Sequence, residues 1–234
     1  MIRTEDKELA EFSLTEGCIA VPLEVYQPIG GEICLTVYPG LESVADEFLR
    51  LFSEEPFSAD AIDWLKKRLT PLAREFGMWP SRDADVHFLD YRLFDRQALD
   101  ESRILPDTEL ADGHTDMSGW KNATTHALEM DPDDPDDACA IHRIGDIIAA
   151  YAALNDFPEE EDVREIHVEC APIYRKSGYA TSCTARLAEF LLARGYSVKY
   201  VCRHTNRASS RVAEKAGFTL VGRKYSFVCY RNEG

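Results

Sequence analysis

The segment 164–195 constrains the fold most, because it predicts a strand, a turn and a helix in immediate succession. Its first part, REIHVEC, has the composition of a strand, and its last part, ATSCTARLAEFLLARG, repeats apolar residues at helical spacing before a terminal glycine. The joining stretch, IYRKSGYATS, contains Gly178 and two neighbouring cations. The first N–H groups of a helix lack partners and carry partial positive charge, so such a turn suits a phosphate. A plain connecting turn is the alternative, since neither the P-loop motif nor GxGxxG is present.

The remaining chain predicts a mixed arrangement of strands and helices without an internal repeat. Strands and turns are expected over the first forty residues, helices over 41–52 and 58–77, a break at 79–82, and a strand over 86–94. A hairpin is expected over 138–154, a strand over 196–202, a short helix ending at Gly217 with Asn206 or Thr205 as its cap, and one or two strands from 218. Residues 95–126 are poorly periodic, and DPDDPDD (131–137) predicts a solvated loop rather than a calcium site.

Charge excludes one class of partner. The formal net charge of −16 argues against a nucleic-acid partner, because phosphate backbones require a basic surface. The charge is uneven, however: residues 162–234 carry thirteen Lys and Arg against six Asp and Glu, whereas 1–161 carry thirteen against 36. The basic segment therefore includes the turn around Gly178. Either the charges are simply solvated, or the basic segment binds a small polyanion.

The seven cysteines are an odd number without a CxxC motif, which favours reduced thiols in a cytoplasmic protein. The N-terminal stretch MIRTEDKELAEF lacks the apolar core of a secretory signal, and no apolar run is long enough to span a bilayer. The histidines show no metal-ligand spacing, so no metal is expected. We therefore expect neither a membrane nor a nucleic-acid partner.

Two linked stretches resemble the GNAT family, the Gcn5-related N-acetyltransferases. They are VECAPIYRKSGYATSCTARLAEFLLARG and YVCRHTNRASSRVAEKAGF, and they resemble most closely the FR47-like branch. The resemblance covers about the last ninety residues and hardly touches the first hundred. It implies an α+β GNAT fold, in which a mixed, mostly antiparallel sheet is flanked by helices, with an N-terminal α/β extension. The expected domains are an accessory region at 1–80 and an acetyltransferase domain at 81–234.

The resemblance also implies the donor, acetyl-CoA, and the residues that bind it. The pantetheine would pair with the strand at Val168 to Cys170, and Asn206 and Ser209 would contact the same arm or the thioester. The pyrophosphate would lie on the backbone amides of Arg175, Lys176, Ser177, Gly178, Tyr179 and Ala180. The side chains of Arg175 and Lys176 would face the phosphates, although they are also ordinary surface cations.

The chemistry requires a base, because a protonated alkylamine with a pKa of about 10 has no lone pair. Glu169 is the first candidate, and the alternative is that it points away from the cleft, since strand residues alternate faces. Tyr151 is the second candidate. A backbone N–H near Cys170 would stabilise the oxyanion.

At one position the chain departs from the family. Many GNAT enzymes have a tyrosine that protonates the leaving thiolate where this chain has Ala213. The alternatives are that Ser209, Ser210 or water replaces it, that no acid is required, or that activity has been lost. The expected function is therefore acetyl-CoA-dependent N-acetylation of a primary amine on a small molecule or peptide, with a cationic acceptor favoured by the acidic first half. The alternative is a non-catalytic acyl-CoA-binding module. We expect a monomer or homodimer.

Overall fold

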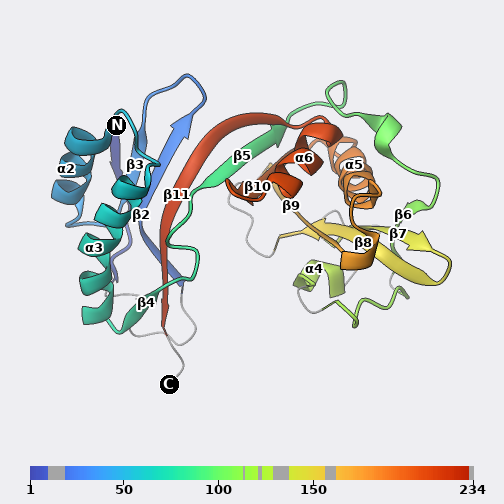
Figure 1. The fold of residues 1–234 in the computed structure, drawn as a ribbon, viewed down its shortest axis with the longest axis horizontal. Helices are drawn as coiled ribbons and strands as arrows, with labels where there is room; N and C mark the ends of the chain where they lie inside the picture. Colours follow the sequence, from blue (N-terminus) through green and yellow to red (C-terminus); the bar gives the residue numbers. More distant parts are fainter. Residues whose placement is uncertain (10–18, 113, 121–122, 129–136, 156–161, 232–234) are drawn as a thin grey trace. The chain divides into compact units, whose positions relative to one another are not determined.

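The computed structural model describes residues 1–9, 19–112, 114–120, 123–128, 137–155 and 162–231 (Figure 1). The chain forms two compact units. The first comprises Met1–Leu89 together with Gly222–Gly234, and the second comprises Asp90–Val221. The solvated loop predicted at 131–137 lies outside the described residues except for Asp137.

The first unit is a small sheet with two helices. Its strands are β1 (Ile2–Thr4), β2 (Ile19–Pro28), β3 (Cys34–Val37), β4 (Met78–Pro80) and most of β11 (Thr219–Arg231), and its helices are α2 (Glu42–Phe52) and α3 (Ala59–Glu75). The strand order is β1-β3-β2-β11, and β4 also pairs with β11. β1 runs parallel to β3, whereas β2 is antiparallel to both β3 and β11. The predicted strands and helices of this region are confirmed.

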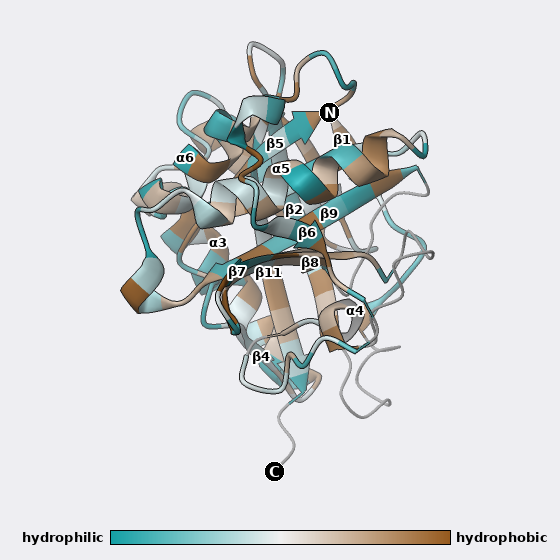
Figure 2. Ribbon diagram, turned by 90° about the vertical axis from the view of Figure 1, so that its right-hand side faces the viewer, coloured by the Kyte–Doolittle hydropathy of each residue, from teal (hydrophilic) through white to brown (hydrophobic). Residues whose placement is uncertain are grey.

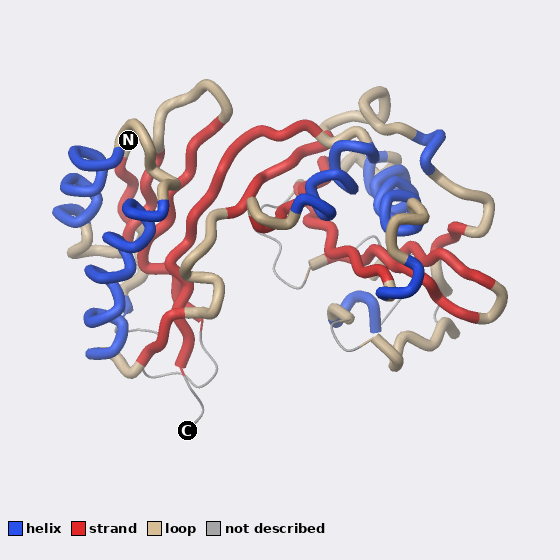
Figure 3. Tube along the Cα trace, in the orientation of Figure 1, coloured by secondary structure: helices blue, strands red, loops and turns tan. Residues whose placement is uncertain are grey.

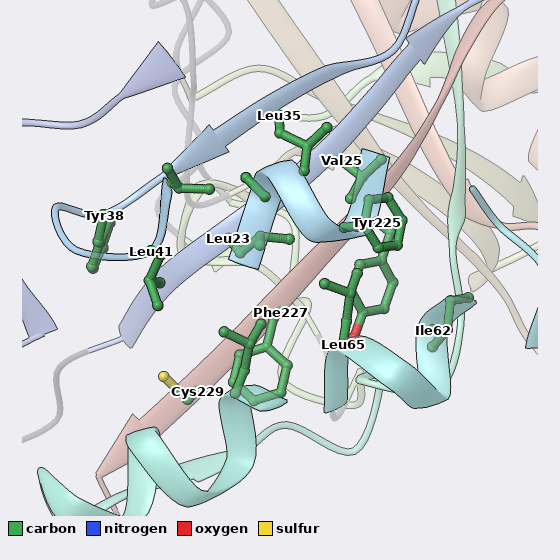
Figure 4. Packing of buried hydrophobic residues seen from close by; sticks show 14 of the residues in the cluster. Leu23, Val25, Leu35, Tyr38, Leu41, Ile62, Leu65, Tyr225, Phe227 and Cys229 are labelled. Carbon is green, nitrogen blue, oxygen red and sulfur yellow. The ribbon is translucent and has the colours of Figure 1, made fainter. Parts of the chain in front are cut away.

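The core of the first unit follows from these amphipathic elements. Leu23, Leu65 and Phe227 are fully buried and come from β2, α3 and β11 (Figure 4). Ser58 caps α3 as predicted, because its side chain accepts a hydrogen bond from the Ala61 N–H. The break predicted at 79–82 is wrong in part, since Met78–Pro80 pairs with β11 as strand β4. Proline is tolerated there because it ends a short strand at the sheet margin.

The second unit contains the predicted strand, turn and helix. Its elements are β5 (Phe88–Leu93), η1 (Glu101–Arg103), β6 (Thr108–Leu110), α4 (Thr125–Leu128), β7 (Cys139–Ile144), β8 (Ile147–Leu154), β9 (Val163–Cys170), η2 (Pro172–Tyr174), α5 (Tyr179–Leu192), β10 (Ser197–Arg203) and α6 (Arg207–Ala216). The strand order from β5 is β5-β10-β9-β8-β7-β6. Figure 3 shows α5 and α6 as separate helices beside these strands.

The sheet of the second unit is mixed and mostly antiparallel, as predicted. β6, β7, β8 and β9 pair antiparallel in succession, and β10 is parallel to β9. The hairpin of β7 and β8 is confirmed, with its turn at Gly145. β6 was not predicted, because three residues are too few to show a period. The helix α6 carries alternating polar and apolar bands (Figure 2), which fits its burial of Ser210, Ala213 and Ala216.

The boundary between the two compact units differs from the predicted boundary between residues 80 and 81. The division runs through two strands, because β5 begins at Phe88 in the first unit and β11 passes from the second unit into the first. Residues from 222 onward belong to the first unit since they form a ladder with β2. The functional division into an accessory region and an acetyltransferase domain stays a prediction.

Two general predictions concern thiols and membranes. The six cysteines within the described residues are free thiols, which agrees with the expected reduced state. No helix in the described part of the chain is both long and apolar enough to cross a membrane.

Candidate active site

The parallel strands β9 and β10 pair only at their beginnings. Their ladder joins residues 163–165 to residues 197–199, whereas the strands continue to Cys170 and Arg203. On its other side β9 stays paired with β8 through to Cys170. The edge of β9 over residues 166–170 is therefore open to an extended ligand, which could add to it as a further strand.

The open edge of β9 presents alternate backbone groups. The Ala171 N–H donates to the Ala149 carbonyl of β8 at 3.0 Å, so the backbone groups of Glu169 also face β8. The N–H groups of Val168 and Cys170, which alternate with these, face the open side. The Cys170 carbonyl on this side already accepts from Arg175 Nε at 3.3 Å. The Val168 and Cys170 N–H groups remain as donors for a ligand.

The turn after β9 gathers a run of backbone N–H groups. Lys176 has φ 70° and Gly178 has φ 91°, so the chain twice enters the left-handed region before α5 begins at Tyr179. The first bond of the helix joins the Ser182 N–H to the Gly178 carbonyl at 2.9 Å. The N–H groups of 176–181 have no acceptor among the described residues. Such a run at the positive end of a helix is a site for an anion.

Glycine is required at 178 by backbone conformation rather than by crowding inside the protein. A Cβ added there would meet no atom of the chain within 4 Å, but its positive φ would strain most other residues. Lys176 accepts such a conformation without being glycine, and its side chain is exposed. Backbone strain held at one turn is typical of a functional site.

Asn206 and Ser209 lie together at the start of α6. Asn206, one of the two predicted candidates, is the cap of the helix, and its side-chain oxygen accepts from the Ser209 N–H at 3.2 Å. Ser209 Oγ lies 2.8 Å from Tyr200 Oη. The amide NH₂ of Asn206 is not used by this cap, so it could donate to a ligand.

The two candidate bases lie opposite each other. Tyr151 of β8 is the register partner of Glu169 of β9, and Tyr151 Oη donates to Glu169 Oε2 at 3.5 Å, which is long for a hydrogen bond. Tyr151 is fully buried and packs edge-on against Trp120. Glu169 is half-buried, and its side chain faces away from those of Val168 and Cys170.

The surroundings of Ala213 contain tyrosines that sequence reasoning missed. Tyr91 Oη donates to Glu214 Oε1 at 3.2 Å, and Tyr200 contacts Ser209. Burial raises the pKa of both phenols, so each gives up its proton less readily than an ordinary tyrosine. Neither is therefore a good acid for a thiolate. No motif in the sequence marks either tyrosine: Tyr91 lies on β5, far from α6 in the chain, and Tyr200 lies on β10, which directly precedes α6.

The cysteines near the turn fit a packing role. Burial raises the pKa of the Cys170 thiol, and it raises the pKa of Cys183 further. A thiol with a raised pKa is a poor nucleophile at neutral pH. Within the described residues no group of three or more His, Cys, Asp or Glu could hold a metal ion.

Comparisons with known proteins give one family-model match and several similar solved structures. Residues 104–218 match the model of the acetyltransferase (GNAT) family. A search of curated proteins found no match. The chain is similar to the solved structure of a GNAT-family protein from Novosphingobium aromaticivorans DSM 12444, with 19% identity, 67% of this chain and 68% of that chain covered, and a TM-score of 0.47.

Two further solved structures extend the similarity over most of the chain. A GCN5-related N-acetyltransferase-like protein from Streptococcus suis 89/1591 has 15% identity, coverage of 97% of this chain and 94% of that chain, and a TM-score of 0.48. A GCN5-related N-acetyltransferase from Sphaerobacter thermophilus has 11% identity, coverage of 90% and 78%, and a TM-score of 0.46. The family-model match is the stronger finding: residues 104–218, just under half of the chain, are similar to the acetyltransferase domain of the GNAT family, and on this match the protein is an acyltransferase.

Proposed function

We propose that this acyltransferase uses acetyl-CoA to acetylate a primary amine. The observation that carries the proposal is the run of backbone N–H groups at 176–181, which directly follows the open edge of β9. A pyrophosphate on the turn and a pantetheine arm along β9 match these two features in order and in chemistry. The arm would accept hydrogen bonds from the N–H groups of Val168 and Cys170, and Asn206 and Ser209 would contact it from α6.

The proposed reaction requires three contributions from the chain. Glu169 would take a proton from the ammonium group, directly or through water, and Tyr151 would orient the carboxylate through its hydroxyl. The amine then forms a bond to the thioester carbonyl carbon, and the carbon–sulfur bond breaks. One of the two open-side N–H groups of β9, at Val168 or Cys170, would donate to the thioester oxygen as charge develops on it, and the other would pair with the rest of the arm. The nitrogen loses its second proton to solvent as the amide forms, and the departing thiolate takes a proton from solvent, either directly or relayed by the Ser209 hydroxyl.

The acceptor is proposed to be cationic, either a small amine or a basic peptide. Residues 1–161 contain 36 Asp and Glu against thirteen Lys and Arg, and an acidic surface raises the local concentration of cations. Assignment to the FR47-like branch, a cytoplasmic location, and a monomeric or dimeric state remain predictions.

A second candidate function is a non-catalytic acyl-CoA-binding module. Ala213 favours it, because this fully buried alanine provides no proton donor at that position of α6. Both functions need the turn at 176–181, which we call the donor turn, so a measurement of acetyl-CoA binding cannot distinguish them. Turnover of acetyl-CoA with a panel of amines does separate them.

The donor assignment is tested by calorimetry with two matched glycine variants. Gly178 and Gly195 lie before and after α5, both have φ near 90°, and neither is crowded. We expect Gly178→Val to abolish binding of acetyl-CoA and Gly195→Val to preserve it, although both lower thermal stability through the same backbone strain. Unchanged affinity in a folded Gly178→Val protein would contradict the donor assignment.

A further inference from the structure

Four side chains form a cluster beneath the turn at 176–181, and three of them are buried while Tyr179 is partly exposed. Thr108 comes from β6, His142 from β7, and Tyr179 and Ser182 from the first turns of α5. Thr108 Oγ1 lies 2.7 Å from His142 Nδ1 and 2.6 Å from Ser182 Oγ. The Tyr179 ring stacks on the His142 ring, with centroids 4.0 Å apart and planes 17° apart. The proposed catalytic groups do not use this cluster.

The hydrogen bonds of the cluster have a preferred direction. The Leu105 N–H donates to Ser182 Oγ at 2.8 Å, so the Ser182 oxygen is an acceptor at one end of this row of hydrogen bonds. Each hydroxyl has a single proton to give. If Ser182 donates to Thr108 and Thr108 donates to His142, every proton is used and Nδ1 accepts. In the reverse direction the Ser182 proton has no acceptor among the described residues.

This direction requires an unprotonated Nδ1, because imidazolium offers only donors. The charged and titratable groups around the ring are few. Asp107 precedes β6 and Tyr179 belongs to α5, while β8 offers only Ala150 as the register partner of His142. Burial lowers the pKa of His142, and Asp107 opposes this shift less strongly. The ring is therefore neutral near pH 7, and the hydrogen-bond chain is intact there.

The cluster is joined directly to the proposed anion site. Tyr179 is the first residue of α5, and its N–H belongs to the run at 176–181. Ser182 makes the first helical bond, to the Gly178 carbonyl. The His142 ring stacks on Tyr179, and the hydrogen bonds through Thr108 hold Ser182. The orientation of the first helical turn therefore depends on both.

We propose that His142 and Thr108 are positioning residues for the acyl-CoA site, which keep the first turn of α5 in place while His142 is neutral. The proposal rests on the proposed donor function. Loss of the hydrogen bonds from Ser182 through Thr108 to His142 is expected to weaken acetyl-CoA binding by roughly 3- to 10-fold, which is the range of one ordinary hydrogen bond. It raises KM for acetyl-CoA and leaves kcat nearly unchanged, because neither side chain touches the reacting atoms.

Two substitutions separate the ring stack from the hydrogen-bond chain. His142→Phe keeps a ring against Tyr179 but cannot accept from Thr108. His142→Asn keeps an acceptor near the position of Nδ1, loses the stack and does not titrate. Tyr225→Phe is the control, since it removes a buried hydroxyl that donates to the Ala84 carbonyl in the first unit. Thermal unfolding of each protein reports the loss of stability.

The test is calorimetry of acetyl-CoA binding between pH 5.5 and 8, with KM and kcat measured at pH 7.5. We expect His142→Phe to bind more weakly at pH 7.5 and Tyr225→Phe to bind as wild type does. As pH falls below about 6.5, wild type should lose affinity faster than His142→Asn. The variant comparison is needed because a phosphate monoester also titrates near pH 6.

The possible failures are distinguishable. If wild type does not bind acetyl-CoA, the proposed donor function and this inference are both wrong. If wild type binds, but His142→Phe has wild-type affinity and the two pH profiles coincide, only the inference is wrong. A fall in kcat without a rise in KM would also overturn it, because a positioning role at the donor turn acts on binding.

Discussion

Glu169 and Tyr151 are the two residues that we propose to act on the acceptor amine. The sequence identified both as candidate bases but left the facing of Glu169 open. The β8–β9 register places them opposite each other, with the tyrosine buried and the carboxylate half-buried. A half-buried carboxylate can reach a bound amine, whereas a fully buried phenol cannot do so without moving. We therefore propose Glu169 as the base and Tyr151 as its support.

Substitution of this pair tests the assignment. We expect Glu169→Gln to lower kcat by about 10²–10⁴-fold, because the amide cannot accept the proton, while acetyl-CoA affinity stays near that of wild type. Tyr151→Phe keeps the buried ring and removes the hydroxyl that donates the long hydrogen bond to Glu169, so its kcat should fall much less. Steady-state kinetics and calorimetry measure both. A larger loss in Tyr151→Phe than in Glu169→Gln would reverse the roles.

The strand, turn and helix around Gly178 could be predicted from the sequence, because their signals lie within one short stretch. Gly178 and the apolar spacing of α5 are local signals, and the positive φ of Gly178 is the expected consequence. The cluster beneath the turn could not be predicted in this way. Its hydrogen bonds join residues 34 and 74 positions apart, and hydroxyl residues at such separations carry no pattern.

At the scale of elements, predictions succeeded where an element carries its own period and stop signal. Helices α3 and α6 begin at Ser58 and Asn206 as expected, because both caps accept hydrogen bonds from the first turn. Strands β4 and β6 were missed since each has three residues and exists only through its partner. The end of the pairing between β9 and β10 likewise could not be predicted, because it depends on both strands together.

The cap of α6 allows two roles of Asn206 to be separated. Asn206→Asp keeps the oxygen that accepts from the Ser209 N–H and replaces the amide NH₂ that would contact the donor. We expect Asn206→Asp to unfold at nearly the wild-type temperature but to bind acetyl-CoA more weakly. Asn206→Ala should lose about 1 kcal/mol of stability as well as affinity. Calorimetric affinity in Asn206→Asp equal to wild type would remove Asn206 from the donor site.

At the scale of the whole molecule, charge is the property with the clearest consequence. The formal net charge of −16 combines an acidic residue range at 1–161 with a basic one at 162–234 that contains the donor turn. The basic range suits the phosphates of the donor, and the acidic range suits a cationic acceptor. Solubility alone is the competing explanation for the acidity.

Salt dependence distinguishes these explanations. If charge attracts the acceptor, kcat/KM should fall as ionic strength rises beyond about 0.1 M, where the Debye length is about 10 Å. The fall should be steeper for a polyamine than for a monoamine, because more charges are screened. The measurement is kcat/KM for both amines across a salt series. Neutral or anionic amines as the best substrates, without a salt effect, would contradict a cationic acceptor.

Strand β11 has a consequence for how the protein is made. Residues 222–231 belong to the first unit, although the whole second unit precedes them in the chain. During synthesis the ribosome therefore releases residues 90–221 before the first unit receives the strand that pairs with β2. Domains usually fold in the order in which they emerge, but here the N-terminal unit has to wait for the later one. Until then β2 exposes an unpaired edge, and the nascent chain needs protection from aggregation at that edge.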